Sequence, residues 1–441
     1  MNLSGRRVLI VGLGASGAAA ARLAHRHGAQ VAVSDAGDGE TVRARLADLA
    51  GVLAAHELGG HTQDRFHWAE VIVVSPGVPL ALPLFETARQ AGAEVIGEVE
   101  LAYAFLDVPI IGITGTKGKS TTTTLLGEML RAAGRNVFVG GNLGTPLSEA
   151  ALQESRPDVV VAELSSFQLE TIHRFRSRIA ALLNLAPDHQ DRYTDFDDYV
   201  AAKMNLFAGQ QPSDFAVLNA ADQGVMTRAR EISSTVFTFG SRHATAYCAG
   251  GELRLRGGGL DETIDVTGFT PPGEHNLRNL EAAALMARLA GATAEAVGEA
   301  AGTYKGLAHR LEPLGEIGGV HYFNDSKATT PGAVSVSLRA MDRPVVLILG
   351  GRDKGGQWQS LQSDIDQSTT AVLAYGEAAE TIAAALTGVR IVGRMEEALD
   401  RAKALAKPGQ AVLLSPGCAS FDQFADFAAR GEALRAWGKR Q

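Results

Sequence analysis

The chain has 441 residues, which is too long for one hydrophobic core and suits two or three domains. Its formal net charge of −8 and its lack of a basic run argue against nucleic acid as a partner. Two cysteines are too few for a disulfide framework and favour a reducing cytoplasm, and no stretch reaches the ~20 apolar residues that span a bilayer. Frequent alanine and glycine with few aromatic residues favour layered α/β packing.

Residues 1–100 predict alternating strands and helices, with strands at 7–12, 29–34 and 71–75. The first strand leads into the turn Gly12-Leu-Gly14-Ala-Ser-Gly17, and Asp35 ends the second strand about twenty residues later. This spacing is typical of a dinucleotide fingerprint. It is weak evidence for NAD, because the same turn binds any diphosphate presented to a helix N-terminus.

A phosphate cradle is predicted at the start of a second block, which runs from about Val108 to Gly306. The apolar run 108–114 predicts a buried parallel strand, and Gly112 to Thr124 form the turn and the helix behind it. Backbone N–H groups in such a turn wrap around phosphate oxygens, a lysine bridges phosphates and a serine holds Mg²⁺. The usual motif has glycine where this chain has Ile113, so we predict a variant loop.

Charged side chains follow the other strands of this block, predicted at 159–163, 179–185 and 215–219 before a small antiparallel piece at 247–266. Glu163 ends a strand where a Mg²⁺ ligand would face the phosphate loop, or it belongs to a helix N-cap cluster. Asp188 to Arg192 form a candidate second metal or phosphate site. Lys203 lies in a predicted helix, and the residues alone leave open whether it is an ordinary surface lysine.

A third block begins near His309, with strands predicted at 320–324, 345–350, 371–375 and 411–415. Arg310 at this junction suits either a clamp on a transferring phosphoryl group or an interdomain salt bridge. The turns 324–330, 350–354 and 415–420 each follow a strand and offer N–H donors or cations. Because ligands bind at the carboxyl ends of parallel strands, the three turns predict a dicarboxylate pocket.

Taken together, these motifs resemble the Mur ligase family of cell-wall peptide synthetases over essentially the full length. The third-block turns are most similar to those of the glutamate-adding members. The motifs that carry the resemblance are 112–124, 163–168, 188–193, 273–276 with Asn279, 306–310, 324–329 and 415–420.

The resemblance implies an α/β fold of three domains. These are a Rossmann-like domain for the UDP substrate at 1–98, a central P-loop ATPase-type sheet with a small antiparallel piece at 99–306, and a Rossmann-like, glutamate-binding domain at 307–441. It implies that ATP phosphorylates the carboxylate of UDP-N-acetylmuramoyl-L-alanine, and that the amine of D-glutamate then displaces phosphate, in peptidoglycan precursor synthesis. The implied cofactors are ATP, two Mg²⁺ ions or Mn²⁺, and carbon dioxide as a carbamate on Lys203. We further expect a cytoplasmic monomer without nucleic-acid partners or membrane insertion.

Site residues carry over from the family motifs position by position. The catalytic set is Lys119, Lys203, His189 and Asn142. The ATP-binding set is Gly115, Thr116, Lys117, Gly118, Lys119, Ser120, Thr121, Asn276, Asn279, Arg310, Asp325 and Lys327. The UDP-substrate set is Gly14, Ala15, Ser16, Asp35, Ser75, Pro76, Gly77, Asn142 and His189. The glutamate set is Thr329, Lys354, Ser420 and Phe427, and the metal ligands are Ser120, Glu163, His189 and carbamylated Lys203.

One departure concerns Lys117, which stands where many relatives have asparagine and adds a cation to the ATP loop. Three other functions remain as alternatives. A nicotinamide-dependent dehydrogenase would leave 112–124 unused, and a non-catalytic nucleotide sensor would not explain Glu163, His189 and Lys203. Another Mur ligase with a different amino acid, such as the muramate:alanine ligase, is the nearest rival. Folate polyglutamylation is disfavoured, because it needs no N-terminal diphosphate-binding block.

Overall fold

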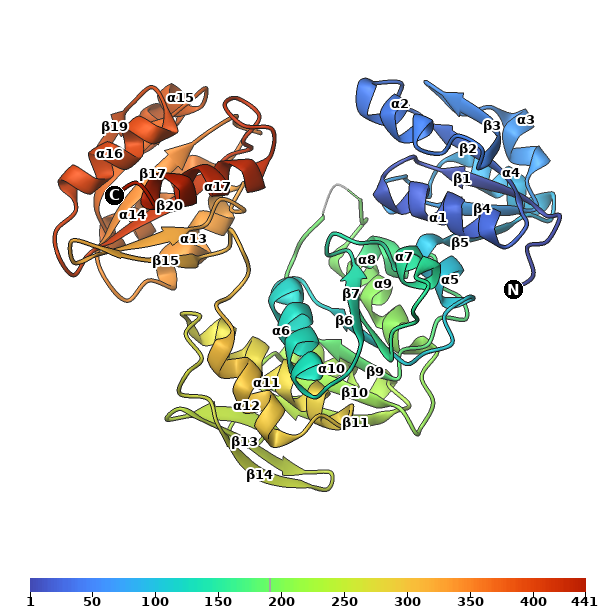
Figure 1. Cartoon of the computed structure of the whole chain (residues 1–441), viewed down its shortest axis with the longest axis horizontal. Helices are drawn as coiled ribbons and strands as arrows, with labels where there is room; N and C mark the ends of the chain where they lie inside the picture. The colour runs from blue at the N-terminus through green and yellow to red at the C-terminus, as the bar shows by residue number, and fades with distance from the viewer. Residues whose placement is uncertain (190–191) are drawn as a thin grey trace. The chain divides into compact units, whose positions relative to one another are not determined.

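The structure, a computed structural model, describes residues 1–189 and 192–441 and contains three β-sheets flanked by helices (Figure 1). The chain divides into two compact units. The first unit comprises Met1–Thr267 and Arg278–Gly302, and the second comprises Gly268–Leu277 and Thr303–Gln441. Two of the sheets belong to the first unit and one to the second.

The N-terminal sheet is entirely parallel, with strand order β3-β2-β1-β4-β5. Its strands are β1 (Arg7–Val11), β2 (Gln30–Asp35), β3 (Leu53–Leu58), β4 (Val71–Val74) and β5 (Glu94–Gly97). Its helices are α1 (Ala15–Arg26), α2 (Glu40–Ala47), α3 (Gln63–Trp68) and α4 (Pro83–Gln90). The edge strands β3 and β5 lie outside the predicted set, because β3 is partly exposed along its length and β5 has only four residues.

Alternate residues of this sheet enter two separate cores, as expected for a parallel sheet covered on both faces. Val8 and Ile10 pack with the alanine-rich face of α1, whereas Leu9 and Val11 pack with Phe66 of α3 on the other side. The continuous apolar runs of the central strands follow from this double burial.

The central sheet has nine strands in the order β14-β13-β12-β11-β10-β9-β6-β8-β7. The parallel strands are β6 (Ile110–Thr114), β7 (Val137–Gly141), β8 (Val159–Glu163), β9 (Ile179–Leu182), β10 (Phe215–Asn219) and β11 (Thr235–Phe239). An antiparallel extension follows as β12 (Ala246–Ala249), β13 (Glu252–Gly257) and β14 (Leu260–Asp265), which confirms the predicted small antiparallel piece. The helices are α5 (Glu98–Tyr103), α6 (Lys119–Ala132), α7 (Leu147–Leu152), α8 (Ser166–Leu169), α9 (Phe196–Ala208), α10 (Gln223–Arg228), η1 (Ala229–Glu231), α11 (Glu274–Leu289) and α12 (Ala294–Thr303).

The first two sheets are joined through contacts of α1 and α5 with α7. Arg22 of α1 pairs with Glu149 of α7 at 2.5 Å, and Arg26 donates to the carbonyl of Leu152 at 2.5 Å. Glu98 is buried at the same junction and accepts from the backbone N–H of Ser148 at 2.5 Å. These contacts join the N-terminal domain to the central domain.

The second unit contains a six-stranded sheet in the order β15-β16-β20-β17-β18-β19, parallel except for β15. Its strands are β15 (Glu312–Ile317), β16 (Val320–Asn324), β17 (Val345–Gly350), β18 (Thr369–Tyr375), β19 (Val389–Ile391) and β20 (Ala411–Gly417). Its helices are α13 (Pro331–Arg339), η2 (Trp358–Leu361), α14 (Gln362–Ser368), α15 (Ala379–Ala385), α16 (Met395–Leu405) and α17 (Phe427–Gly438). Alternate residues of β17 and β20 again supply two cores.

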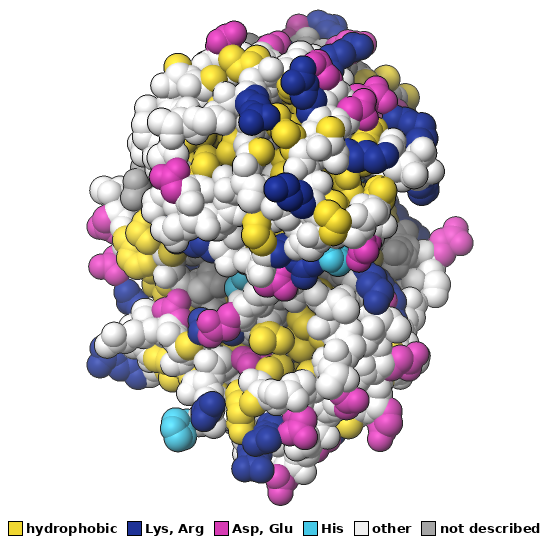
Figure 2. Space-filling model, turned by 90° about the vertical axis from the view of Figure 1, so that its left-hand side faces the viewer, with side chains coloured by type: hydrophobic (Ala, Val, Ile, Leu, Met, Phe, Trp, Pro, Cys, Tyr) yellow, Lys and Arg dark blue, Asp and Glu magenta, His cyan; other side chains and the backbone are white. Residues whose placement is uncertain are grey.

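The predicted fold class, three-domain α/β with mostly parallel sheets, is therefore confirmed. The boundaries after residues 98 and 306 stay predictions. Lysine, arginine, aspartate and glutamate side chains are interspersed over the face shown in Figure 2 and do not separate into fields of one sign. Of the helices that the structure describes, none is both long enough and apolar enough to cross a bilayer.

Candidate active site

The predicted phosphate loop connects β6 to α6, as the sequence indicates. Gly115 and Gly118 have positive φ angles of 149° and 85°, and α6 begins directly after Gly118. A Cβ on Gly118 would stand 2.4 Å from Oδ1 of Asn279 in α11, and φ is positive, so both the contact and the backbone favour glycine here. Asn279, which the resemblance places on the adenine side of the ATP site, thus lies beside the phosphate loop.

The variant form of the loop has a packing explanation. Gly112 lies inside β6, where a Cβ would stand 2.5 Å from Oγ of Ser177 and 2.7 Å from a methyl carbon of Leu206. Ile113 is fully buried in the same strand. Residue 113 is therefore part of the core rather than of the turn, and the flexible positions begin at Gly115.

Asn184 fixes the shape of the loop from the end of β9. Its Oδ1 accepts from the backbone N–H of Lys117 at 2.8 Å, and its Nδ2 donates to the carbonyl of Lys117 at 2.9 Å. The N–H of Thr116 donates to the Asn184 carbonyl at 3.0 Å. The Lys117 side chain itself is exposed. Sequence reasoning missed Asn184, whose only signal is a polar residue directly after an apolar strand.

Two lysines converge on one carbonyl of the loop. Lys119 donates from Nζ to the carbonyl oxygens of Gly115 at 2.8 Å and Thr116 at 3.0 Å, and Lys203 of α9 donates to that of Gly115 at 3.0 Å. Lys203 is only 2 % exposed, so the surface-lysine interpretation is wrong. Burial and then the charge of Lys119 lower the pKa of Lys203 to about 7, against an opposing effect of Asp188.

Glu163 at the end of β8 offers a free carboxylate oxygen. The residue is 2 % exposed and lies opposite Ile113 in the register of β6 and β8. Its Oε1 accepts from Nδ2 of Asn142 at 2.6 Å, whereas the buried Oε2 has no hydrogen-bond partner among residues 1–189 and 192–441. An orphaned buried carboxylate oxygen beside a phosphate loop fits a hard divalent cation. Ser165, not Glu163, caps α8, which excludes the N-cap alternative.

His189 follows β9 and lies at the surface. It has a positive φ of 52°, its side chain is 43 % exposed, and its ring lies 4.7 Å from that of Phe167. Gln190 and Asp191 of the predicted second site lie outside the described residues. Within the described part of the chain, no three His, Cys, Asp or Glu side chains form a metal cluster. A cation here would therefore need other ligands, such as the Ser120 hydroxyl and phosphate oxygens.

Arg192 closes this motif with structural contacts. It pairs with Glu170 at 2.7 Å, lies 4.2 Å from the Phe167 ring, and donates to the carbonyl of Pro76 at 3.1 Å. The last bond reaches from the central domain to the N-terminal domain. This guanidinium thus connects the N-terminal and central domains, which together line a cavity.

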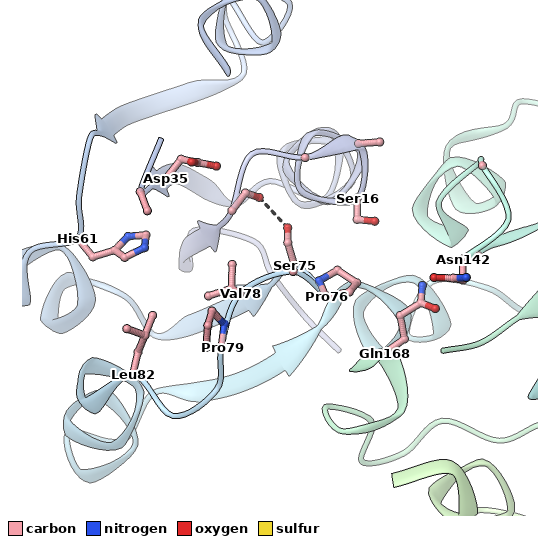
Figure 3. A pocket seen from close by; sticks show the side chains of 17 residues that line it. Ser16, Asp35, His61, Ser75, Pro76, Val78, Pro79, Leu82, Asn142 and Gln168 are labelled. Atoms are coloured by element: carbon pink, nitrogen blue, oxygen red, sulfur yellow. Dashed lines mark hydrogen bonds between the residues drawn. The ribbon is translucent and has the colours of Figure 1, made fainter. Parts of the chain in front are cut away.

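A cavity of about 630 Å³ lies where the N-terminal and central sheets meet (Figure 3). Its lining includes eight of the nine residues predicted for the UDP substrate, His189 being the exception: Gly14, Ala15, Ser16, Asp35, Ser75, Pro76, Gly77 and Asn142. The glycine turn has the compact form that its spacing predicts. A Cβ on Gly17 would stand 2.0 Å from the Gly12 carbonyl oxygen, to which the Ser75 hydroxyl donates at 2.6 Å.

Further lining residues carry no recognisable motif and were missed by sequence reasoning: Ala36, His61, Val78, Pro79, Leu82, Gly141 and Gly144. Gln168, also in the lining, belongs to the motif that begins at Glu163. Its Oε1 accepts from the N–H of Ser165 in the α8 capping box at 3.0 Å. Loops from two domains line this cavity, and no local sequence pattern predicts that these loops lie side by side.

The predicted site residues of the second unit occupy turns at one sheet edge. Arg430 of α17 is fully buried and donates to the carbonyls of Ser326 at 2.8 Å, Cys418 at 3.0 Å and Gly350 at 3.5 Å. It therefore joins all three turns of the predicted dicarboxylate pocket, and β16, β20 and β17 are indeed neighbours. Sequence reasoning missed Arg430, which lies in a helix without a motif.

The remaining residues of this unit differ in burial. Asp325 is buried and accepts from the hydroxyls of Ser337 and Ser415 at 2.6 Å each, while burial raises its pKa to about 6 against those bonds. Lys354 and Arg310 are exposed, and Ser420 is buried. The ammonium of Lys327 lies 5.5 Å from the Phe427 ring, and Asn276 donates to the Pro272 carbonyl at 2.6 Å. Thr329 is half-buried. The ligand contacts of all these residues stay predictions.

Comparison with known proteins covers all three domains. A MurD-like N-terminal domain of Mur ligases matches residues 6–97, the Mur ligase middle domain matches 113–287, and the glutamate ligase domain of Mur ligases matches 309–418. Proteins named UDP-N-acetylmuramoylalanine--D-glutamate ligase are similar over the whole chain. The one from Anaeromyxobacter dehalogenans is 46% identical, covering 100% of this chain and 98% of its own length, and the one from Desulfatibacillum aliphaticivorans is 43% identical, covering 98% of each.

Solved structures show the same fold at low identity. A MurF ligase from Thermotoga maritima in complex with ADP has a TM-score of 0.61 and 16% identity, covering 93% of this chain and 96% of that one. A UDP-N-acetylmuramate-alanine ligase from Thermotoga maritima has a TM-score of 0.60 and 17% identity, covering 99% of this chain and 100% of that one. On the strength of the full-length relatives, the chain belongs to the Mur ligase family.

Proposed function

We propose that this chain is an ATP-dependent, ADP-forming ligase that joins D-glutamate to UDP-N-acetylmuramoyl-L-alanine in peptidoglycan precursor synthesis. The observation that carries the proposal is the bond between Asn142 and Glu163. Asn142 lines the cavity, and Glu163 stands beside the phosphate loop, so this bond connects the two. A carboxylate at the Asn142 end of the cavity would therefore lie near the γ-phosphate. The names of the full-length relatives support this choice of substrates.

The first step transfers a phosphoryl group. A carboxylate oxygen of the alanine attacks the γ-phosphorus, the bond to the β-phosphate oxygen breaks, and ADP leaves. Lys119 would exchange the Gly115 and Thr116 carbonyls for phosphate oxygens, and the N–H groups of the loop would donate to the same phosphates. Asn279 would contact the nucleotide from α11.

In the second step the amine of D-glutamate attacks the carbonyl carbon of the acyl phosphate. Inorganic phosphate leaves, and the nitrogen loses its proton as the amide forms. We assign Thr329, Lys354, Ser420 and Phe427 to the glutamate. Arg310, Asp325, Lys327 and Asn276 would serve the nucleotide.

Ser120 and Glu163 would hold one Mg²⁺, and His189 with carbamylated Lys203 a second, for which Mn²⁺ could substitute. Bound Mg²⁺ neutralises charge on the phosphates and the developing leaving group. The carbamate requires a neutral amine that adds to carbon dioxide. A pKa of about 7 leaves a large neutral fraction of Lys203 at neutral pH, unlike a surface lysine. We expect the enzyme to be cytoplasmic and monomeric.

Phosphate release tests this function. The enzyme, ATP, Mg²⁺ and UDP-N-acetylmuramoyl-L-alanine are combined with D-glutamate, L-glutamate or L-alanine. Release with D-glutamate alone supports the proposal down to its stereochemistry. Release with another amine would keep the ligase mechanism and reassign the second unit, and no release with any amine would overturn the function.

A further inference from the structure

The end of the cavity away from Asn142 and Gln168 has its own polar side chain. Figure 3 shows His61 projecting toward the cavity there, near Asp35, Val78 and Leu82. His61 lies in the turn between β3 and α3. We propose that His61 is a specificity-determining residue that reads the uracil base of the nucleotide sugar by accepting a hydrogen bond from its N3–H. This inference rests on the proposed function.

A chain of hydrogen bonds selects the tautomer of the neutral His61 ring. Ser34 and Glu57 are register partners on β2 and β3, and the Ser34 hydroxyl lies 2.8 Å from Glu57 Oε2 and 2.7 Å from His61 Nδ1. Burial opposes ionisation of Glu57, but hydrogen bonds from Thr62 and Ser34 hold its pKa below the ordinary value. Glu57 is therefore an ionised carboxylate, which only accepts.

Ser34 has one proton, and the charged acceptor Glu57 takes it in preference to a neutral imidazole nitrogen. The Ser34 oxygen must then accept from Nδ1–H of His61. A neutral imidazole with its proton on Nδ1 has an unprotonated Nε2, which is an acceptor. Nε2 has no hydrogen-bond partner in the part of the chain that the structure describes. The relay therefore leaves one acceptor available to a ligand in the cavity.

The reacting groups decide which part of the substrate meets His61. The muramoyl-alanine carboxylate must lie at the Asn142 end, near the phosphate loop. The diphosphate suits the middle, where Gly14 precedes the N-terminus of α1. The base is then left for the end formed by His61, Val78 and Leu82, where apolar walls suit its flat faces. Uracil has a donor at N3, whereas cytosine has an acceptor there.

Asp35 is the other acceptor at this end, but its carboxylate braces the glycine turn. Oδ2 accepts from the backbone N–H of Leu13 at 2.5 Å, and Oδ1 accepts from that of Gly37 at 2.7 Å. Each of its oxygens already accepts one backbone N–H bond, whereas Nε2 of His61 accepts none from the described residues.

Calorimetric titration of the full chain with UDP, CDP and 3-methyl-UDP tests the assignment. We expect the wild type to bind UDP about tenfold or more tightly than either analogue, because each analogue lacks the N3–H donor. His61→Phe should bring the three affinities within about threefold of one another. His61→Gln, which keeps an acceptor near the Nε2 position, should restore the preference. Ser34→Ala should reduce the preference for UDP, since Nδ1–H loses its acceptor, whereas a merely structural defect would weaken all three ligands alike.

The outcomes distinguish the assignment of His61 to the base from the proposed function. If UDP binds and His61→Phe keeps the full preference over 3-methyl-UDP, the role of His61 is refuted while the proposed function stands. If the wild type does not bind UDP at all, the assignment of the cavity to the nucleotide sugar fails, and with it the proposed function. Melting curves of each variant identify any that fail to fold, and His61→Gln and Ser34→Ala then decide the question.

Discussion

Replacing Lys203 by methionine should stabilise the protein while removing its activity. The side chain is 2 % exposed, and the lowering of its pKa from 10.5 to about 7 corresponds to about 5 kcal/mol of destabilisation of the charged form. Methionine has a similar length and no charge. Its cost is the lost hydrogen bond to the Gly115 carbonyl, about 1 kcal/mol. The net gain should therefore be about 4 kcal/mol in acid solution.

The sign of the pH dependence follows from the lowered pKa. Between about pH 7 and 10.5 the unfolded chain binds a proton at Lys203 that the folded chain does not, so wild-type stability rises with pH in this window. Below about pH 7 the folded wild type bears the full free-energy cost of burying the charged Lys203 amine. The advantage of Lys203→Met should thus be largest near pH 6 and vanish as the pH approaches 10.5.

Thermal unfolding in carbon dioxide-free buffer measures this effect, since a carbamate would change the charge of the wild type. For a domain of this size, about 4 kcal/mol raises the melting temperature by on the order of 10 °C. Lys407→Met, at an exposed lysine, serves as the control and should leave the melting temperature unchanged. An advantage of Lys203→Met that is absent near pH 6, or that does not vary with pH, would refute the reasoning.

Three further changes probe the phosphate loop, the metal ligand and the glutamate-side turns. Glu163→Gln should lower kcat by about a hundredfold or more and raise the Mg²⁺ requirement, because the free buried oxygen is lost; an unchanged Mg²⁺ titration of phosphate release would contradict this. Gly118→Ala should weaken ATP binding, since its Cβ would stand 2.4 Å from Oδ1 of Asn279 and displace that side chain from the loop. Gly134→Ala, also at positive φ but in open space, should cost only about 1 kcal/mol of strain and leave ATP affinity unchanged. Equal ATP affinities of these two variants would argue against the contact. Arg430→Met should destabilise the second unit by about 3 kcal/mol or more and raise the KM for glutamate, because it leaves buried carbonyls unpaired. Arg440→Met, at an exposed arginine, is the control. Similar melting temperatures for the two variants would refute this role of Arg430.

The parts of the fold that the sequence predicts are those with local patterns. Strand β6, the glycines behind it and helix α6 are consecutive, so periodicity and turn chemistry identify them together. The central strands are buried on both faces, so they have continuous apolar runs that the sequence also reveals. The edge strand β3 alternates half-buried and exposed residues, and His56 and Glu57 interrupt its apolar residues, so its pattern does not stand out.

The site was harder to predict where it depends on tertiary contacts. Asn184 reaches the loop from another strand, and Arg430 reaches three turns from a helix about a hundred residues beyond the first of them. Resemblance to a family supplied the full set of nine residues predicted for the UDP substrate, and the structure gathers eight of them in one cavity. His61 belonged to no motif, because its proposed role depends on hydrogen bonds that link it through Ser34 of β2 to Glu57 of β3.

The buried amine of Lys203 also restricts how this sequence can drift. Of the 41 basic residues only nine are lysines, so most basic positions of the chain are arginine. At position 203 that exchange would place a guanidinium, which stays charged at any physiological pH, in a site that favours the neutral amine. An exposed position such as Lys407 imposes no such requirement on the charge of its side chain. The buried site at residue 203 thus depends on a side chain that can lose a proton, which lysine can do and arginine cannot.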